Sequence, residues 1–278
     1  MVGKDERHWS DIPPTEASPL NFAISAIDRE AVDLVEAALQ SRRLRLAYQP
    51  VVQAARPEKI AFYEGLIRVM DPAGRAIPAR DFMSAVETRE TGRLIDCAAL
   101  EMGLAALARN PGVRIAINMS ARSIGYPRWI KTLKRGLAAH PTIGERLILE
   151  ITESSAMLVP ELVTAFMDDL QREGIAFALD DFGAGFTAFR YFKDFFFDIV
   201  KIDGQFIRNI HRDPDNQVLT QALATIGKHF DMFTVAEAVE TVEEAAFLRG
   251  IGIDCLQGYL FGAPTVRPAW AEEGRKSA

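Results

Sequence analysis

Eight short β-rich segments recur along this chain, mostly separated by longer segments with helical periodicity, and this alternation constrains the fold most. The runs are RLAYQPVV (45–52), KIAFYEGLIR (59–68), VRIAINMS (113–120), RLILEITE (146–153), IAFALDD (175–181), FDIVKID (197–203), MFTVAEAV (232–239) and DCLQGYLF (254–261). Strands that alternate with helices indicate βα units and a parallel sheet. Eight such strands in 278 residues, near the ~250 residues of a typical α/β barrel, predict a single closed barrel.

The longer segments have patterns typical of amphipathic helices. Segment 161–173 places its apolar residues on one side and is followed by Gly174, a suitable C-terminal stop. Segments 28–44, 217–230 and 242–248 are similar.

The first connection between strands is too short for a parallel crossover. Only about six residues separate 45–52 from 59–68, whereas a crossover needs about a dozen or more. We therefore expect these two strands to pair antiparallel. The predicted fold class is α/β, a modified TIM (β/α)8 barrel with one antiparallel strand.

Composition and charge exclude several classes of protein. Apolar residues make up 49% and charged residues 25%, which excludes a disordered chain. A net charge of −6 argues against binding to polymeric nucleic acid. The N-terminus has charges where a signal peptide needs apolar residues, and no run approaches the ~20 apolar residues of a spanning helix. We therefore expect a cytoplasmic protein without membrane insertion.

The chain is expected to form one domain. Residues 1–20 are polar and contain three prolines, which predicts a flexible leader that either docks a protein partner or is disordered. Residues 21–278 contain no linker that would divide them. Cys97 and Cys255 are too few for a disulfide framework and lie outside CxxC and CxxH motifs, so a thiolate zinc site is not supported.

Each predicted strand contains a polar or ionisable residue, in most cases near its C-terminal end. In chain order these are Gln49, Glu64, Asn118, Glu150, Asp180 with Asp181, Lys201, Glu237 and Gln257. Burying an isolated carboxylate costs several kcal/mol, so chance does not explain one in strand after strand. Catalytic groups of barrels converge at the C-terminal ends of the strands.

The chemistry of this set favours hard divalent cations. Carboxylate and carboxamide oxygens without cysteine or histidine suit Mg²⁺ or Mn²⁺, and five carboxylates exceed what one ion needs. A centre of two ions is consistent with phosphodiester cleavage, with Lys201 orienting or deprotonating the attacking water. Simpler interpretations exist for single residues: Glu64 as a solvated strand residue, the Asp180–Asp181 pair as turn residues, Lys201 as an ion-pair partner and Glu240 as a helix-start carboxylate. They do not explain the recurrence by strand.

At these residues the chain resembles the EAL family of cyclic di-GMP phosphodiesterases. The resemblance covers roughly residues 31–264, with the pieces YQPVV, EGLIR, INMS, LEITES, LDDFGAGF, DIVKID, VAEAVET and LQGYLF in family order. It implies a modified TIM barrel that hydrolyses cyclic di-GMP to linear pGpG with two Mg²⁺ or Mn²⁺ ions. It also implies a homodimer.

The resemblance also implies roles for individual residues. The first ion is assigned to Glu64, Asn118, Glu150 and Asp180, and the second to Asp180, Asp181 and Glu237. Lys201 matches the residue that positions or activates the water, and Glu64 and Glu237 complete the catalytic group. Substrate binding is assigned to Gln49, Arg68 and Gln257, with Arg68 at a phosphate. Glu153 and Glu240 match supporting positions, Glu153 bracing the loop 182–189.

Three departures from the family pattern leave a second interpretation open. Gly65 replaces the alanine of the signature, and on a strand it points away from the side of Glu64. Ala238 replaces a usual glycine, and Phe186–Thr187–Ala188 replace Tyr-Ser-Ser. The alternative is a catalytically inactive cyclic di-GMP receptor that acts through a protein partner. The aromatic run FRYFKDFFFD is expected either to pack in the core or to form a dimer surface.

Overall fold

A computed structural model of the chain describes residues 19–185 and 192–271. The strands are β1 Leu44–Gln53, β2 Arg56–Met70, β3 Ala76–Pro78, β4 Ile115–Asn118, β5 Leu147–Thr152, β6 Ala176–Phe182, β7 Ile199–Ile202, β8 Phe233–Ala236 and β9 Cys255–Gln257. The helices are α1 Pro19–Gln40, α2 Met83–Val86, α3 Glu90–Arg109, α4 Pro127–Ala139, α5 Glu153–Ala156, α6 Pro160–Gln171, α7 Gly204–Ile207, α8 Pro214–His229 and α9 Val242–Gly250. Short 3₁₀ helices lie in connections between these elements and include η3 Ala79–Asp81, η4 Ala121–Ser123, η5 Gly144–Arg146 and η7 Ile210–Arg212.

The strands close into a barrel, as the sequence predicts. The order around the sheet is β1-β9-β8-β7-β6-β5-β4-β2, and the pairing of β1 with β2 closes the ring. From β2 through β9 the neighbours are parallel, whereas β1 is antiparallel to both β2 and β9. The modified (β/α)8 barrel with one antiparallel strand is therefore confirmed.

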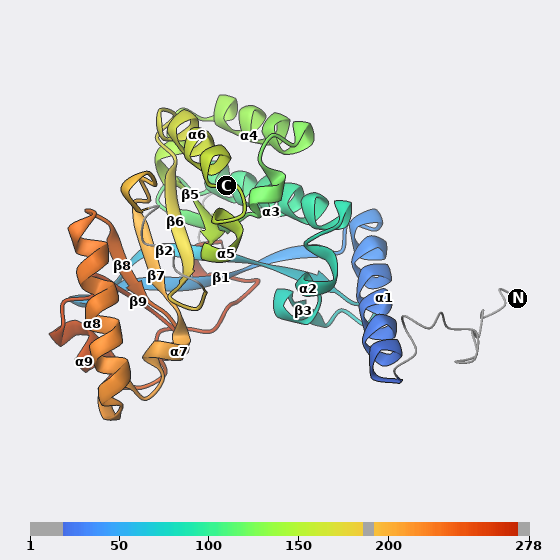
Figure 1. Cartoon of the computed structure of the whole chain (residues 1–278). Helices are drawn as coiled ribbons and strands as arrows, with labels where there is room; N and C mark the ends of the chain where they lie inside the picture. The colour runs from blue at the N-terminus through green and yellow to red at the C-terminus, as the bar shows by residue number, and fades with distance from the viewer. Residues whose placement is uncertain (1–18, 186–191, 272–278) are drawn as a thin grey trace, which may run out of the picture.

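The β1–β2 hairpin is longer than expected. Its strands reach Gln53 and Arg56, so the turn between them is shorter than the sequence pattern indicated. At the other end β2 pairs antiparallel with the three-residue strand β3, which we did not predict. Figure 1 shows α1, α2 and β3 gathered at that end of the hairpin.

Helix boundaries follow local backbone signals. Helix α6 ends near Gly174, which has a φ of +82° and so takes the left-handed conformation that suits glycine. Helix α1 ends at Gln40, earlier than expected, because Arg42 adopts a φ of +53° and the chain then enters β1. Residues 1–18 of the expected leader lie outside the described residues. No helix in the described ranges is both long and apolar enough to span a membrane.

The interior of the barrel is filled by one apolar residue from each of its eight strands. These are Val51, Phe62, Ala116, Ile148, Ala178, Ile199, Val235 and Cys255, all buried. A second, larger core lies between the strands and the surrounding helices. Gly65 faces this outer core, as expected, since a Cβ there would lie 2.8 Å from Cδ1 of Ile117. The polar side chains of the same strands lie next to this buried apolar layer.

Most of the described part of the aromatic run packs in the outer core. Phe192, Phe195 and Phe197 are buried, whereas Phe196 is 70% exposed. The packing interpretation thus holds for three of these four phenylalanines. Residues 186–191 lie outside the described residues, and with them lies the altered segment Phe186–Thr187–Ala188.

Candidate metal centre

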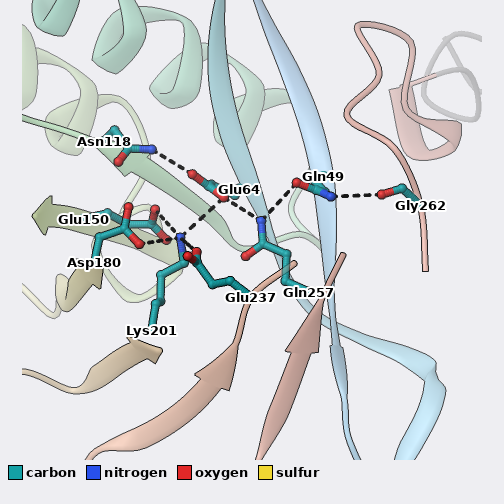
Figure 2. A network of polar contacts seen from close by, with 9 residues as sticks. All are labelled: Gln49, Glu64, Asn118, Glu150, Asp180, Lys201, Glu237, Gln257 and Gly262. Carbon is teal, nitrogen blue, oxygen red and sulfur yellow. Dashed lines mark hydrogen bonds and ion pairs between the residues drawn. The ribbon is translucent and has the colours of Figure 1, made fainter. Parts of the chain in front are cut away.

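The polar residues of the strands form a second layer directly above the apolar barrel layer. Each lies two residues from an interior apolar residue, because side chains on a strand alternate between faces. The offset is +2 on the parallel strands, as from Ile148 to Glu150, and −2 on antiparallel β1, from Val51 to Gln49. Figure 2 shows the eight side chains converging: Gln49, Glu64, Asn118, Glu150, Asp180, Lys201, Glu237 and Gln257.

Lys201 lies at the centre of this layer. Its Nζ is 2.7 Å from Glu237 Oε1, 3.0 Å from Asp180 Oδ1, 3.1 Å from Glu150 Oε2 and 3.4 Å from Glu64 Oε2, and its side chain is 1% exposed. Burial alone would lower the pKa of Lys201, but the four carboxylates outweigh it and hold that pKa well above its ordinary value. The surrounding carboxylates therefore favour the charged form of this side chain.

The carboxylates around Lys201 are not equivalent. Burial raises the pKa of Glu150 and of Glu237 well above the ordinary range, despite the nearby Lys201. Burial acts in the same direction on Glu64, but Lys201 and hydrogen bonds from Gln257 and Asn118 outweigh it, so the pKa of Glu64 is lowered. More negative charge is thus buried here than a single lysine stabilises.

Two groups of carboxylates have the spacing of metal ligands. Oxygens of Glu64, Glu150 and Asp180 lie within 4.8 Å of one another, and so do oxygens of Asp180, Asp181 and Glu237. Asp180 is common to both groups. Oε1 of Glu150 has no hydrogen-bond partner among the described residues, although the residue is fully buried. A buried orphan oxygen of this kind is what a bound cation would satisfy.

The charge balance fits two divalent ions. Five carboxylates face one lysine, so the fully ionised site has an excess of four negative charges, which two dications would neutralise. Oxygen ligands suit Mg²⁺ and Mn²⁺. The side chains present therefore fit the expected metals.

A chain of hydrogen bonds connects the metal ligands to the opposite side of the barrel. Asn118 Nδ2 donates to Glu64 Oε1 at 2.8 Å, and Gln257 Nε2 donates to Glu64 Oε2 at 2.6 Å. The same Gln257 nitrogen lies 3.2 Å from Gln49 Oε1, and Gln49 Nε2 donates to the carbonyl of Gly262 at 3.1 Å (Figure 2). Both oxygens of Glu64 are thereby fixed in orientation.

The second carboxylate group extends into the loop after β6. Asp181 has a φ of +56°, and burial, with help from Asp180 and Asp203, raises its pKa to about 6. Glu153, 2% exposed at the start of α5, accepts a hydrogen bond from the Gly183 amide at 3.1 Å. This contact fastens the loop beside Asp181 to the end of β5.

Arg68 and Glu240 do not join the central network. Arg68 is on the same face of β2 as Glu64, four residues further along, and its Nη1 donates to the carbonyl of Ile67. Glu240 is exposed, and its backbone amide donates to Glu244 Oε2 at 2.8 Å. Glu240 lies at the rim of the cavity described next.

A cavity of about 520 Å³ opens beside the carboxylates. Gln49, Glu64, Glu237 and Gln257 line it, whereas Arg68, the third residue expected to bind substrate, is not among its lining residues. Residues from the segment after β7, which includes the short helix α7, and from the loop after β9 also line it: Asp203, Gly204, Gln205, Arg208 and Tyr259. These further residues were not predicted. They follow β7 and β9, in which Lys201 and Gln257 were the predicted site residues. The sequence around them contains no motif that indicates a binding residue.

Ala238 shows how closely these loops approach each other. It adopts a φ of +53°, a conformation that favours glycine. A Cβ added to Gly204 would lie only 2.6 Å from the Ala238 Cβ, so the methyl group of Ala238 fits because residue 204 has no side chain. The alanine that replaces the family's usual glycine is thus a strained residue that packs against Gly204.

The fold and the site together define a class of protein: closed α/β barrels with a cluster of acidic residues at the C-terminal ends of their strands. The EAL domain model matches residues 32–264, and the chain belongs to this family. It is 31% identical to MucR, a bifunctional diguanylate cyclase/cyclic di-GMP phosphodiesterase of Pseudomonas aeruginosa, over 82% of this chain and 34% of MucR. It is 31% identical to the cyclic di-GMP phosphodiesterase PdeR of Escherichia coli, over 82% of this chain and 35% of PdeR.

The solved structures agree with this assignment. The MucR phosphodiesterase in complex with cyclic di-GMP superposes with a TM-score of 0.75 at 29% identity, covering 87% of this chain and 99% of that one. The chain spans about a third of the length of the two curated relatives.

Proposed function

We propose that this chain hydrolyses cyclic di-GMP to linear pGpG in second-messenger signalling, with two Mg²⁺ or Mn²⁺ ions. The observation that most supports this function is the cluster of five carboxylates in two overlapping groups that share Asp180, four of them within ion-pair distance of the buried Lys201. Family membership supports the same reaction.

The residues present suggest which side chains would hold each ion and which would orient the attacking water. Glu64, Asn118, Glu150 and Asp180 would hold one ion, and Asp180, Asp181 and Glu237 the other. Bound divalent ions would supply positive charge at the phosphodiester and lower the pKa of water. Lys201 Nζ, within reach of both groups, is placed to orient the attacking water. The water oxygen bonds to phosphorus and the water loses a proton, the bond from phosphorus to the 3′ oxygen breaks, and the 3′ oxygen takes up a proton, so that one water is consumed for each bond broken.

The substrate would lie in the adjoining cavity. Gln49 and Gln257 line it and are held by their mutual hydrogen bond, so their amides are pre-oriented toward a ligand. Arg68, about half buried on the β2 face that contains Glu64, is proposed to meet a phosphate. Glu153 and Glu240 are proposed to support the loops beside the ions.

A turnover assay tests this function. The full chain is incubated with cyclic di-GMP and either Mg²⁺ or Mn²⁺, and pGpG is followed by chromatography. We expect turnover that Glu64→Ala abolishes and that Ca²⁺ inhibits, because calcium prefers more ligands and longer bonds. Binding of cyclic di-GMP without turnover in the presence of either metal would overturn the proposed hydrolytic activity and favour the receptor alternative.

Several expectations accompany the proposed function and stay predictions. They are a cytoplasmic location, a homodimer and a protein partner for the leader, residues 1–20. Measurement of the sedimentation coefficient over a range of protein concentrations tests the dimer.

A further inference from the structure

We propose that Arg208 is a specificity-determining residue of this site, which recognises a guanine base of the cyclic dinucleotide, and that Glu244 positions it. The inference rests on the proposed function, since it concerns the ligand of the same cavity. Arg208 follows α7 and lines the cavity beside Ala238, Glu240 and Tyr259.

Arg208 is the cation of an otherwise acidic cavity. Among the described lining residues, Glu64, Asp203, Glu237 and Glu240 are acidic and Arg208 alone is basic. Arg208 is exposed, and no described carboxylate lies within ion-pair distance of its guanidinium. The guanidinium is therefore available to bind a ligand in this cavity.

The backbone on both sides of the Arg208 side chain is fixed. Its own amide donates to the carbonyl of Gly204 at 3.1 Å, and the next amide, of Asn209, donates to Glu244 Oε1 at 2.7 Å. Asn209 has a φ of +56°, so the chain turns sharply there. A side chain that starts from a fixed backbone loses less freedom on binding.

Glu244 connects this turn to the loop after β8. It is 3% exposed, and its second oxygen accepts from the amides of Glu240 and Thr241 at 2.8 and 3.0 Å. One carboxylate thus holds together the two loops on which Arg208 and Glu240 lie. Three backbone hydrogen bonds to one buried side chain are more than the helix cap alone requires, since the cap uses only the Thr241 amide and the reciprocal Thr241 side chain.

The chemistry of the cavity rim matches a guanine base. A guanidinium can donate two hydrogen bonds to O6 and N7 of guanine, whereas adenine presents an amino donor in place of O6. Tyr259 lines the same cavity and is 61% exposed, so it offers an aromatic face on which a base can stack. Gly258 allows this placement, because a Cβ there would lie 2.0 Å from the carbonyl oxygen of Val239.

Equilibrium binding of two cyclic dinucleotides tests the proposal. Calorimetry in Ca²⁺ compares cyclic di-GMP with cyclic di-AMP for the full chain and for Arg208→Ala. We expect Arg208→Ala to reduce the preference for cyclic di-GMP by about tenfold or more, the value of one bidentate contact to guanine. Arg212→Ala is the matched control, since Arg212 is exposed in the same segment and does not line the cavity; it should keep the full preference.

A second pair of variants tests Glu244 as a positioning residue. Glu244→Ala removes the connection to Asn209, whereas Thr241→Ala weakens the cap of α9 and leaves that connection in place. We expect Glu244→Ala to lower the base preference and Thr241→Ala to keep it, even where both lower the melting temperature. Equal preferences in the two variants would overturn the positioning role.

The outcomes separate this proposal from the proposed function. If the unaltered chain binds cyclic di-GMP and Arg208→Ala keeps the full preference, the inference fails and the proposed function stands. If Arg208→Ala weakens both ligands equally, Arg208 contacts a phosphate, and base recognition is wrong. If the unaltered chain binds neither ligand, both the function and the inference fail.

Discussion

Lys201 Nζ and Glu237 Oε1 lie 2.7 Å apart because of the register between β7 and β8. Lys201 pairs with Val235 in the parallel ladder, and Glu237 is two residues beyond Val235 on the same face. The amide of Glu237 extends the ladder by donating to the carbonyl of Ile202 at 3.2 Å. The ion pair at the centre of the site is therefore a consequence of backbone pairing rather than of loop conformation.

Lys201→Met is expected to abolish turnover and to destabilise the protein most in a chelator. The substitution removes the cation from four carboxylates, and uncompensated buried charge costs about 3–5 kcal/mol. Urea denaturation is measured in EDTA and in Mn²⁺, and Mn²⁺ should restore part of the loss. An equal loss of stability in both buffers would contradict cation sites around Lys201.

Asp180→Asn should remove most of the stabilisation that Mg²⁺ or Mn²⁺ provides. Asp180 contributes to both carboxylate groups. A ligand that binds only the native state raises the free energy of unfolding by about 2.7 kcal/mol when its concentration is a hundred times its dissociation constant. Thermal unfolding is followed as the metal is titrated. Asp169→Asn, on the exposed side of α6, is the control and should respond as the unaltered chain does. A full metal response in Asp180→Asn would argue against a shared ligand.

The barrel could be predicted from sequence because most of its strands alternate with helices, but the ends of the strands could not be predicted. The apolar pattern DCLQGYLF continues past β9, whereas the strand stops at Gln257. The chain leaves the sheet there because Gly258 lies against the backbone of Val239, a contact that no pattern reveals. Helix α3 was missed because its buried residues lie on several sides, so its periodic contrast is weak.

The polar layer could be predicted from the sequence, whereas the cavity rim could not. A strand repeats every two residues, so Glu150 above Ile148 follows once the strand is recognised. Arg208 and Tyr259 are placed by loops whose course depends on the turn at Asn209 and the close approach at Gly258. The spacing of Thr241 and Glu244 is that of a capping box, a signal that indicates the helix start but not the bond to Asn209.

Ala238→Gly should stabilise the protein by ~0.5–1 kcal/mol, because the left-handed conformation strains alanine and not glycine. Gly204→Ala should instead destabilise it by about 1–3 kcal/mol, since the added Cβ would meet Ala238 at 2.6 Å. In the Ala238→Gly background the same substitution should be nearly neutral. Urea denaturation of the four proteins measures this coupling, and equal costs of Gly204→Ala in both backgrounds would contradict the contact.

Asp96 predicts a pH dependence of stability that is separate from the metal ligands. It lies in α3, is 7% exposed, and its Oδ2 accepts from Ser123 Oγ at 2.6 Å and from the Ser120 amide at 3.1 Å. Burial outweighs these two hydrogen bonds and raises the pKa of Asp96 from 3.8 to about 7. The native state therefore favours the protonated carboxyl.

As pH rises, the unfolded state releases the Asp96 proton at a lower pH than the native state does. Between about pH 4 and pH 7 the unfolded chain ionises Asp96 before the native state does, so rising pH destabilises the protein, by about 1.4 kcal/mol for each unit by which the pKa is raised. Above about pH 7 both states are ionised and the effect levels off. Asp96→Asn does not titrate, so its stability relative to the unaltered chain should increase across this window. Urea denaturation of both proteins in EDTA, repeated at several pH values, measures the difference between their free energies of unfolding. The titration of the metal ligands is common to both proteins and cancels in this difference. A difference that stays constant from about pH 4 to pH 8 would show that the pKa of Asp96 is not raised.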